Sequence, residues 1–211
     1  IGDLFYKAGL PRDLLHLVHG GAALGNFLVS GLDHAGVLFT GSNQAAWSIQ
    51  KSLVKPGCPI VPFVAETGGI NMLIADSSAL PEQLVMDVID SAFGSAGQRC
   101  SALRVLTVQE DIAPEVLEML GGAMAMLNVG DPMSLATDVG PVIDQGAQDQ
   151  VLNAIASLEK TAKKIAQTPL KDGLNGYFIA PSAYQIKDLS SLKEEVFGPL
   201  LHVMTYAASD I

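Results

Sequence analysis

Short apolar runs alternate with helix-like stretches along the first third of the chain. Strands are predicted at residues 36–40 and 60–65, and helices at 22–29 and 44–53, the latter with Asn43 as its cap. Leu14–Val18 is also short and apolar, which predicts a further strand. The repeated order of strand and helix indicates a parallel sheet with crossover helices, and therefore an α/β fold.

The pattern changes after the segment Glu66-Thr67-Gly68-Gly69. A helix is predicted to begin at Pro81, because proline suits the first helical position. The glycine pair is the expected boundary between residues 1–67 and residues 68–211. The elements predicted beyond it are strands at 71–75, 103–108, 176–186 and 200–206, and helices at 81–95, 113–127 and 145–163.

Composition and charge narrow the function classes. The chain has 211 residues, 49% of them hydrophobic, which is enough apolar material for a sizeable core. Its 12 Lys and Arg against 22 Asp and Glu give a net charge of -10, which argues against binding to nucleic acid. No apolar run is long enough to span a bilayer. The four histidines lack metal-ligand spacing, so no metal site is predicted.

Cys100 stands among small residues, in Ser95-Ala96-Gly97-Gln98-Arg99-Cys100-Ser101-Ala102, after the predicted end of a helix. Gly97 lets the backbone approach a ligand closely. Backbone N–H groups beside a thiol can stabilise a thiolate, or an oxyanion formed at its target. The residues alone favour the opposite interpretation, a small buried hydrophobe. Cys58, in the turn Pro56-Gly57-Cys58-Pro59, has no acid, base or glycine-rich segment beside it and is interpreted as structural.

Two further positions are candidates for chemistry. Glu66 ends an apolar strand, and catalytic groups cluster at the carboxyl ends of strands in α/β folds. A solvated acid is the alternative there. Gly41-Ser42 joins a strand to a helix, where a phosphate or nicotinamide can meet helix N–H groups. The chain has no G-x-G-x-x-G pattern at this point, so the residues alone favour an ordinary turn.

Four motifs follow one another in a definite order: Phe39-Thr40-Gly41-Ser42, Glu66 to Asn71, Phe93 to Cys100, and Glu195-Val196-Phe197-Gly198-Pro199. Their order and spacing resemble the aldehyde dehydrogenase superfamily over essentially the whole chain. The segments that carry a narrower resemblance look most like L-glutamate γ-semialdehyde (pyrroline-5-carboxylate) dehydrogenases, in the form found in bacterial bifunctional proline utilization A. They are Ser91–Arg104, Asp138–Ile143 and Glu195–Val203.

The resemblance implies an aldehyde dehydrogenase-like α/β fold. Residues 1–67 would be the C-terminal part of a Rossmann-type NAD-binding domain, and residues 68–211 part of the catalytic domain. Cys100 would be the nucleophile, and Glu66 the general base that activates water for deacylation. The other implied roles are cofactor binding by Thr40, Gly41, Ser42, Glu195 and Phe197, and aldehyde binding by Phe93, Arg99 and Ser101.

The resemblance also implies NAD as the cofactor, with FAD confined to a separate proline dehydrogenase domain of the parent protein. The expected reaction is oxidation of L-glutamate γ-semialdehyde by a homo-oligomeric enzyme, in the cytoplasm or at the inner face of the membrane. The family's Pro-Trp-Asn segment and adenosine-binding lysine lie outside this sequence, so an inactive piece of a longer chain is expected, and NAD against NADP stays open. Another substrate, such as succinate semialdehyde, and a non-catalytic module are the alternatives.

Overall fold

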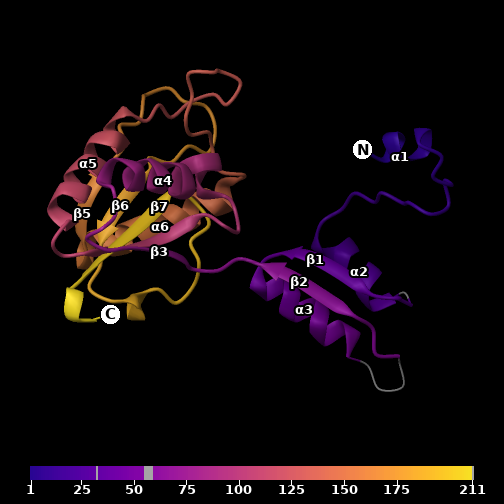
Figure 1. Ribbon diagram of the computed structural model, residues 1–211. Coiled ribbons are helices and arrows are strands. Elements are labelled where there is room, and N and C mark those ends of the chain that lie inside the picture. The colour runs from indigo at the N-terminus through magenta and orange to yellow at the C-terminus, as the bar shows by residue number, and fades with distance from the viewer. Residues whose placement is uncertain (32, 55–58, 211) are drawn as a thin grey trace. The chain divides into compact units, whose positions relative to one another are not determined.

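The computed structural model describes residues 1–31, 33–54 and 59–210 (Figure 1). Cys58 lies outside these residues. The described chain divides into two compact units, Ile1–Thr67 and Gly68–Ile211.

The first unit contains a parallel pair of strands, β1 (Val37–Gly41) and β2 (Phe63–Thr67), joined through helix α3 (Asn43–Leu53). Helices α1 (Gly2–Lys7) and α2 (Ala22–Gly31) precede them. The cap of α3 is Ser42 rather than the expected Asn43. Ser42 has extended backbone angles and its Oγ accepts a hydrogen bond from the Ala45 N–H at 3.2 Å, whereas Asn43 is already helical.

The strand expected at Leu14–Val18 is wrong, because this segment is irregular. A strand needs the N–H and C=O groups of a neighbouring strand. In the described part of the first unit, β1 and β2 pair only with each other, so the apolar run finds no such neighbour.

The second unit is built on a five-stranded sheet with the order β3-β4-β7-β6-β5. Neighbouring strands are parallel except β5 and β6, which are antiparallel. The strands are β3 (Asn71–Ala75), β4 (Leu103–Gln109), β5 (Lys163–Gln167), β6 (Ser182–Gln185) and β7 (Leu200–Tyr206), and the helices are α4 (Pro81–Phe93), α5 (Ala113–Met126) and α6 (Gln145–Thr161).

The core of this unit lies around β4 and β7. All seven residues of β4 are buried, as expected for a central parallel strand covered on both faces. Helix α4 packs on β4, β7 and α5 (Figure 1) with Leu84, Val88 and Ala92, which recur every four residues and so lie on one face. Burying a leucine or valine stabilises the fold by about 1.5–3 kcal/mol, which fixes α4 and the loop that follows it.

Several element boundaries differ from the sequence-based expectation, and strand β5 was not expected. The helix predicted over 145–163 ends at Thr161, and the next residues form the edge strand β5. Strand β5 pairs antiparallel with β6 at the sheet edge, a long-range contact that local sequence does not report. The strand predicted over 176–186 is limited to β6, since Gly176 has a φ of +143°, outside the strand region.

Candidate active site

The first unit brings four of the predicted residues to one edge of its strand pair. In the parallel register, Thr40 lies opposite Glu66 and Gly41 lies opposite Thr67. Ser42 follows at once and begins α3, a helix of 11 residues whose first N–H groups face this edge. Thr40 and Glu66 are both exposed. A helix N-terminus beside the carboxyl ends of parallel strands suits a negatively charged or polar group of a ligand.

In the second unit, Cys100 is exposed on the loop between α4 and β4. Exposure excludes the alternative in which this cysteine is a small buried hydrophobe. Arg99 and Ser101, predicted to bind the aldehyde, are exposed on either side of it. Glu66 belongs to the first unit and Cys100 to the second.

The Cys100 loop has an unusual backbone. The 3-10 turn η1 (Gly94–Gly97) holds three consecutive residues at positive φ, with 55° at Ser95, 55° at Ala96 and 66° at Gly97. Only glycine adopts this region without cost, so the first two positions store strain. Strain of this kind persists where the surrounding structure over-determines the conformation, and it is common at functional sites.

Two amide side chains supply part of that restraint. Asn71, at the start of β3, donates from Nδ2 to the carbonyl oxygens of Cys100 at 2.8 Å and of Ala102 at 2.9 Å. Gln98 donates to the carbonyl oxygens of Ser95 and Pro141, both at 3.2 Å, and accepts from the N–H of Ile143 at 2.9 Å. The backbone on both sides of the thiol is therefore tied to the sheet and to the 141–143 segment.

The Glu195–Pro199 segment packs directly against this loop. A Cβ on Gly97 would lie 2.2 Å from the carbonyl oxygen of Gly198, so the two backbones touch. Glu195 accepts hydrogen bonds from Arg104 at 2.9 and 3.1 Å. Phe197 is 38% exposed, with its ring 5.5 Å from the Arg104 guanidinium carbon. Two predicted cofactor residues thus lie on a segment that packs against the loop carrying the predicted nucleophile.

Phe93 occupies a different environment from the other predicted aldehyde-binding residues. It is the last residue of α4, only 1% exposed, and belongs to the hydrophobic core. Its first role here is to fix the end of α4, from which the Cys100 loop departs. Its assignment to the aldehyde pocket stays a prediction.

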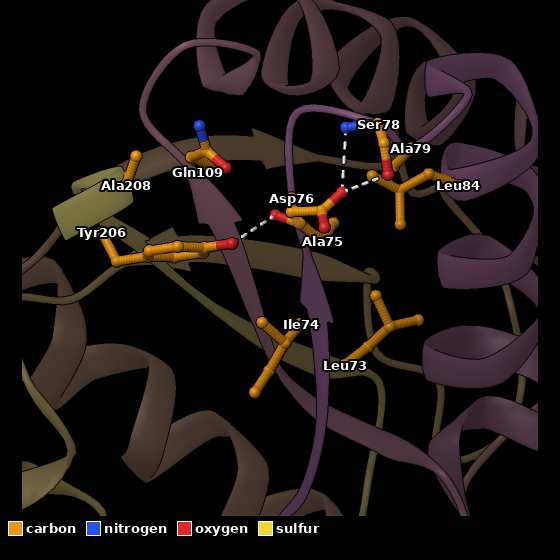
Figure 2. Close-up of a pocket in the computed structure, with 10 residues that line it drawn as sticks. All are labelled: Leu73, Ile74, Ala75, Asp76, Ser78, Ala79, Leu84, Gln109, Tyr206 and Ala208. Carbon is orange, nitrogen blue, oxygen red and sulfur yellow. Dashed lines mark hydrogen bonds between the residues drawn. The ribbon is translucent and has the colours of Figure 1, made fainter. Parts of the chain in front are cut away.

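The site of the second unit lies at the amino-terminal edge of the sheet. The Cys100 loop leads into β4, the Glu195 segment leads into β7, and Asn71 begins β3. Ligands of open parallel sheets usually bind at the opposite, carboxyl edge. That edge holds a cavity of about 460 Å³, shown in Figure 2, lined by residues that include Asp76, Gln109 and Tyr206.

The Figure 2 cavity contains none of the predicted site residues. Two of its polar side chains are hydrogen-bonded to other lining residues: Asp76 Oδ1 accepts from the N–H and Oγ of Ser78 at 2.9 and 2.6 Å, and Tyr206 donates to the Ala75 carbonyl at 3.2 Å. The candidate active site is therefore the Cys100 edge, although the general rule for parallel sheets favours the other.

A buried histidine, His202, contacts the backbone of Arg104 close to the site. His202, on β7, is buried, and its Nδ1 lies 3.1 Å from the carbonyl oxygen of Arg104. Burial away from water lowers the pKa of His202 below its usual 6.5, and the charge of Arg104 acts in the same direction. A neutral ring with Nδ1–H donating to that carbonyl fits this position.

Over residues 1–31, 33–54 and 59–210, no cluster of His, Cys, Asp and Glu could hold a metal ion, and no helix is long and apolar enough to cross a membrane.

Three supporting residues received no role from the sequence: Asn71, Gln98 and Arg104. Each lies inside or next to a motif that the resemblance used. For Arg104 the available signal was an arginine inside the largely apolar predicted strand at 103–108, because a charge on a buried strand requires a partner.

Comparisons with known proteins agree on one family. The model of the aldehyde dehydrogenase family matches residues 1–210. The bifunctional protein PutA of Escherichia coli (strain K12) is 42% identical over 214 residues, which cover 96% of this chain and 16% of that protein. A crystal structure of mutant proline utilization A (PutA) from Bradyrhizobium japonicum is similar with a TM-score of 0.94 and 47% identity, covering 99% of this chain and 21% of that one.

A third similar protein is 1-pyrroline-5-carboxylate dehydrogenase from Thermus, solved with bound NAD. Its TM-score is 0.87 at 28% identity, and the match covers 97% of this chain and 40% of that one. The chain therefore spans less than half the length of each of these three relatives.

Proposed function

Because this chain belongs to the aldehyde dehydrogenase family, we propose that it forms part of an NAD-dependent enzyme that oxidises L-glutamate γ-semialdehyde to L-glutamate. The observation that carries the proposal is Cys100, exposed on a loop that a network of hydrogen bonds holds in a strained conformation. The similarity to PutA and to 1-pyrroline-5-carboxylate dehydrogenase supports the choice of aldehyde.

In this proposal, the Cys100 thiolate attacks the aldehyde carbon. A carbon–sulfur bond forms, and the carbonyl π electrons move to oxygen to give a tetrahedral oxyanion. Sulfur suits this step because it is a strong nucleophile and later a good leaving group. We assign the exposed flanking residues Arg99 and Ser101 to substrate contact, with Ser101 at the α-carboxylate.

The residues present fit a dinucleotide. Glu195 keeps Oε2 unpaired among the described residues, because both Arg104 contacts go to Oε1, so Oε2 can accept from a ribose hydroxyl. Thr40, Gly41 and Ser42 present a strand end and a helix N-terminus to the cofactor's polar groups. Bound NAD would supply a two-electron hydride acceptor; loss of hydride from the substrate carbon as its C=O bond re-forms would leave a thioester on Cys100.

Glu66 is assigned to the second half of the reaction. Its carboxylate takes a proton from water while the water oxygen attacks the thioester carbon. The carbon–sulfur bond then breaks, the thiolate leaves, and L-glutamate is released. A positioned general base typically contributes about 10²–10⁴-fold to such a step. We assign residues 1–67 to the cofactor domain, residues 68–211 to the catalytic domain, and FAD to a separate part of the complete protein.

The test is cofactor reduction by the complete protein that contains this chain. We expect reduction of NAD with L-glutamate γ-semialdehyde, and a kcat/KM at least about tenfold lower with succinate semialdehyde, which lacks the carbon that carries the amino group. Cys100→Ala serves as the control variant and should lose turnover but keep NAD binding in a fluorescence titration.

The outcomes separate three hypotheses. Equal kcat/KM values on the two aldehydes would overturn the substrate assignment and leave the chemistry intact. Full turnover by Cys100→Ala would overturn the nucleophile assignment. If the wild-type protein reduces neither NAD nor NADP with any semialdehyde, the chain is a non-catalytic module and the proposal is wrong.

A further inference from the structure

We propose that Arg104 is a positioning residue that holds the nucleophile loop and the Glu195 carboxylate in one fixed arrangement. This inference rests on the proposed function, which gives Cys100 and Glu195 their roles. Arg104 touches neither the substrate nor the cofactor in this proposal. It acts through the groups that do.

The burial of Arg104 is the first observation. Of all Lys, Arg, Asp and Glu residues that the structure describes, Arg104 alone is buried, with 3% of its side chain exposed. Its partner Glu195 is 15% exposed at the side chain. Taking charges out of water is costly unless each charge is paired and its remaining N–H groups are satisfied. The arginine must therefore have partners close to all sides of its guanidinium.

The partners of Arg104 lie on two different segments. Its Nε and Nη2 donate to Glu195 Oε1 at 3.1 and 2.9 Å, and its Nη1 donates to the Gly198 carbonyl at 3.1 Å. Nη2 also reaches the carbonyl oxygen of Arg99, the residue directly before Cys100, at 3.4 Å. Only the planar fork of arginine can serve these points together, because the lysine ammonium is a single point charge on a flexible stem.

The backbone that carries the Arg104 side chain lies in a buried strand. Arg104 is the second residue of β4, between the buried residues Leu103 and Val105, and its carbonyl contacts the His202 ring on β7. The Arg104 backbone is thus fixed in the centre of the sheet, while its guanidinium reaches the Cys100 loop and the Glu195–Pro199 segment at the sheet edge.

Glycine contacts make the arrangement sensitive to small shifts. A Cβ on Gly68 would lie 1.8 Å from Glu195 Oε2, and a Cβ on Gly97 would lie 2.2 Å from the Gly198 oxygen. The carboxylate is therefore confined between Gly68 and Arg104. A displacement of Glu195 must move either the backbone at Gly68 or the Arg104 guanidinium, and the guanidinium is itself bonded to the carbonyl oxygen of Arg99, directly before Cys100. Cofactor contact at Glu195 and placement of the thiol are coupled through Arg104.

The experiment uses Arg104→Met, Arg104→Lys, Glu195→Gln and the double variant Arg104→Met/Glu195→Gln in the complete protein. Lys164→Met is the matched control, because it removes the exposed ion pair of Lys164 with Glu159 at 2.9 Å. The readouts are KM for NAD, kcat, and the pH profile of iodoacetamide alkylation at Cys100, located by peptide mass spectrometry.

We expect Arg104→Met to raise KM for NAD and to lower kcat, each by about tenfold or more, since truncating one partner of a buried charge pair is costly. It should also shift the pH profile of Cys100 alkylation. Arg104→Lys should recover part of both losses. In the Glu195→Gln background, Arg104→Met should change KM for NAD by less than about threefold, because residues in one network are not additive. Lys164→Met should leave both constants near the wild-type values.

Two results would overturn the inference: Arg104→Met with KM and kcat close to wild type, or an effect of Arg104→Met that is the same with and without Glu195→Gln. If Arg104→Met does not fold, Arg104→Lys decides, and an unchanged KM for NAD in that variant overturns the inference. A wild-type protein without turnover refutes the proposed function and removes this inference with it. An active wild type with unaffected Arg104 variants refutes the inference alone.

Discussion

Replacing Gly97 by alanine is expected to damage both stability and catalysis, although it adds a single methyl group. Gly97 has a φ of +66°, in the left-handed region. Its added Cβ would lie 2.2 Å from the oxygen and 2.6 Å from the carbon of the Gly198 carbonyl, and 3.0 Å from the Ala92 oxygen. These neighbours are backbone atoms, so none of them can rotate away as a side chain would.

The magnitude follows from two costs. The left-handed conformation costs an L-residue about 1–2 kcal/mol. Overpacking by a methyl group costs about 1–3 kcal/mol more. A total near 3 kcal/mol corresponds to a fall of roughly 6–12 °C in the melting temperature of a domain of 150–250 residues. Relief of the clash must move either the Glu195 segment or the loop that carries Cys100, and a misplacement of about 1 Å can lower the rate about 10²-fold.

The assay combines differential scanning calorimetry of the complete protein with steady-state cofactor reduction. Gly122→Ala is the matched control: Gly122 lies inside α5, and a Cβ there meets no atom within 4 Å. An alanine should stabilise that helix by about 1 kcal/mol and leave turnover unchanged.

The reasoning is refuted if Gly97→Ala melts at or above the wild-type temperature with normal kcat. Normal turnover with a lower melting temperature would refute the link between this backbone contact and the thiol. A loss of activity by Gly122→Ala would show that the activity assay responds to any added methyl group.

Three further predictions concern single side chains. Glu66→Gln should slow deacylation by about 10²–10⁴-fold and give a stopped-flow burst of reduced cofactor, and steady turnover at the wild-type rate would contradict the base assignment. Asn71→Asp should lower kcat more than Asn71→Ala. A carboxylate repels the two carbonyl oxygens that the amide binds, whereas in the alanine variant water can reach the exposed Cys100 carbonyl. A larger loss of kcat in Asn71→Ala would contradict this prediction. Burial lowers the folded-state pKa of His202 below 6.5. The neutral His202 ring therefore makes its full contribution to the free energy of unfolding above pH 6.5. This contribution is lost as the pH falls from 6.5 through the folded-state pKa. His202→Asn should flatten that decline in pH-dependent melting curves, whereas the exposed control His16→Asn should retain it.

The sequence predicts the second unit well where local and long-range preferences agree. The α/β class is confirmed, and β4, α5 and β7 lie within one residue of their expected limits. Pro81 begins α4 as predicted. The aldehyde dehydrogenase resemblance is confirmed by the family match over residues 1–210. Each of these elements has a strong local signal and a buried face.

The errors arise where pairing or packing decides. Strand β5 has the polar sequence Lys-Lys-Ile-Ala-Gln, which resembles the end of the preceding helix, and only its antiparallel pairing with β6 makes it a strand. Leu14–Val18 has a strand-like sequence but no strand beside it in the described first unit. The supporting roles of Asn71 and Arg104 could not be predicted for the same reason, because they depend on partners 29 to 94 positions away in the sequence. The roles assigned to Glu66 and to the cofactor-binding and aldehyde-binding residues stay predictions.

The left-handed turn at Ser95, Ala96 and Gly97 makes the placement of the Cys100 thiol a property of the folded unit rather than of its local sequence. A synthetic peptide of residues 94–102 would contain the thiol and its neighbours but would relax, because two of its residues avoid that conformation when nothing restrains them. An electrophile fitted to the folded loop would therefore discriminate between folded and denatured protein. The rate at which such a reagent modifies the Cys100 sulfur would therefore measure whether the second unit is folded.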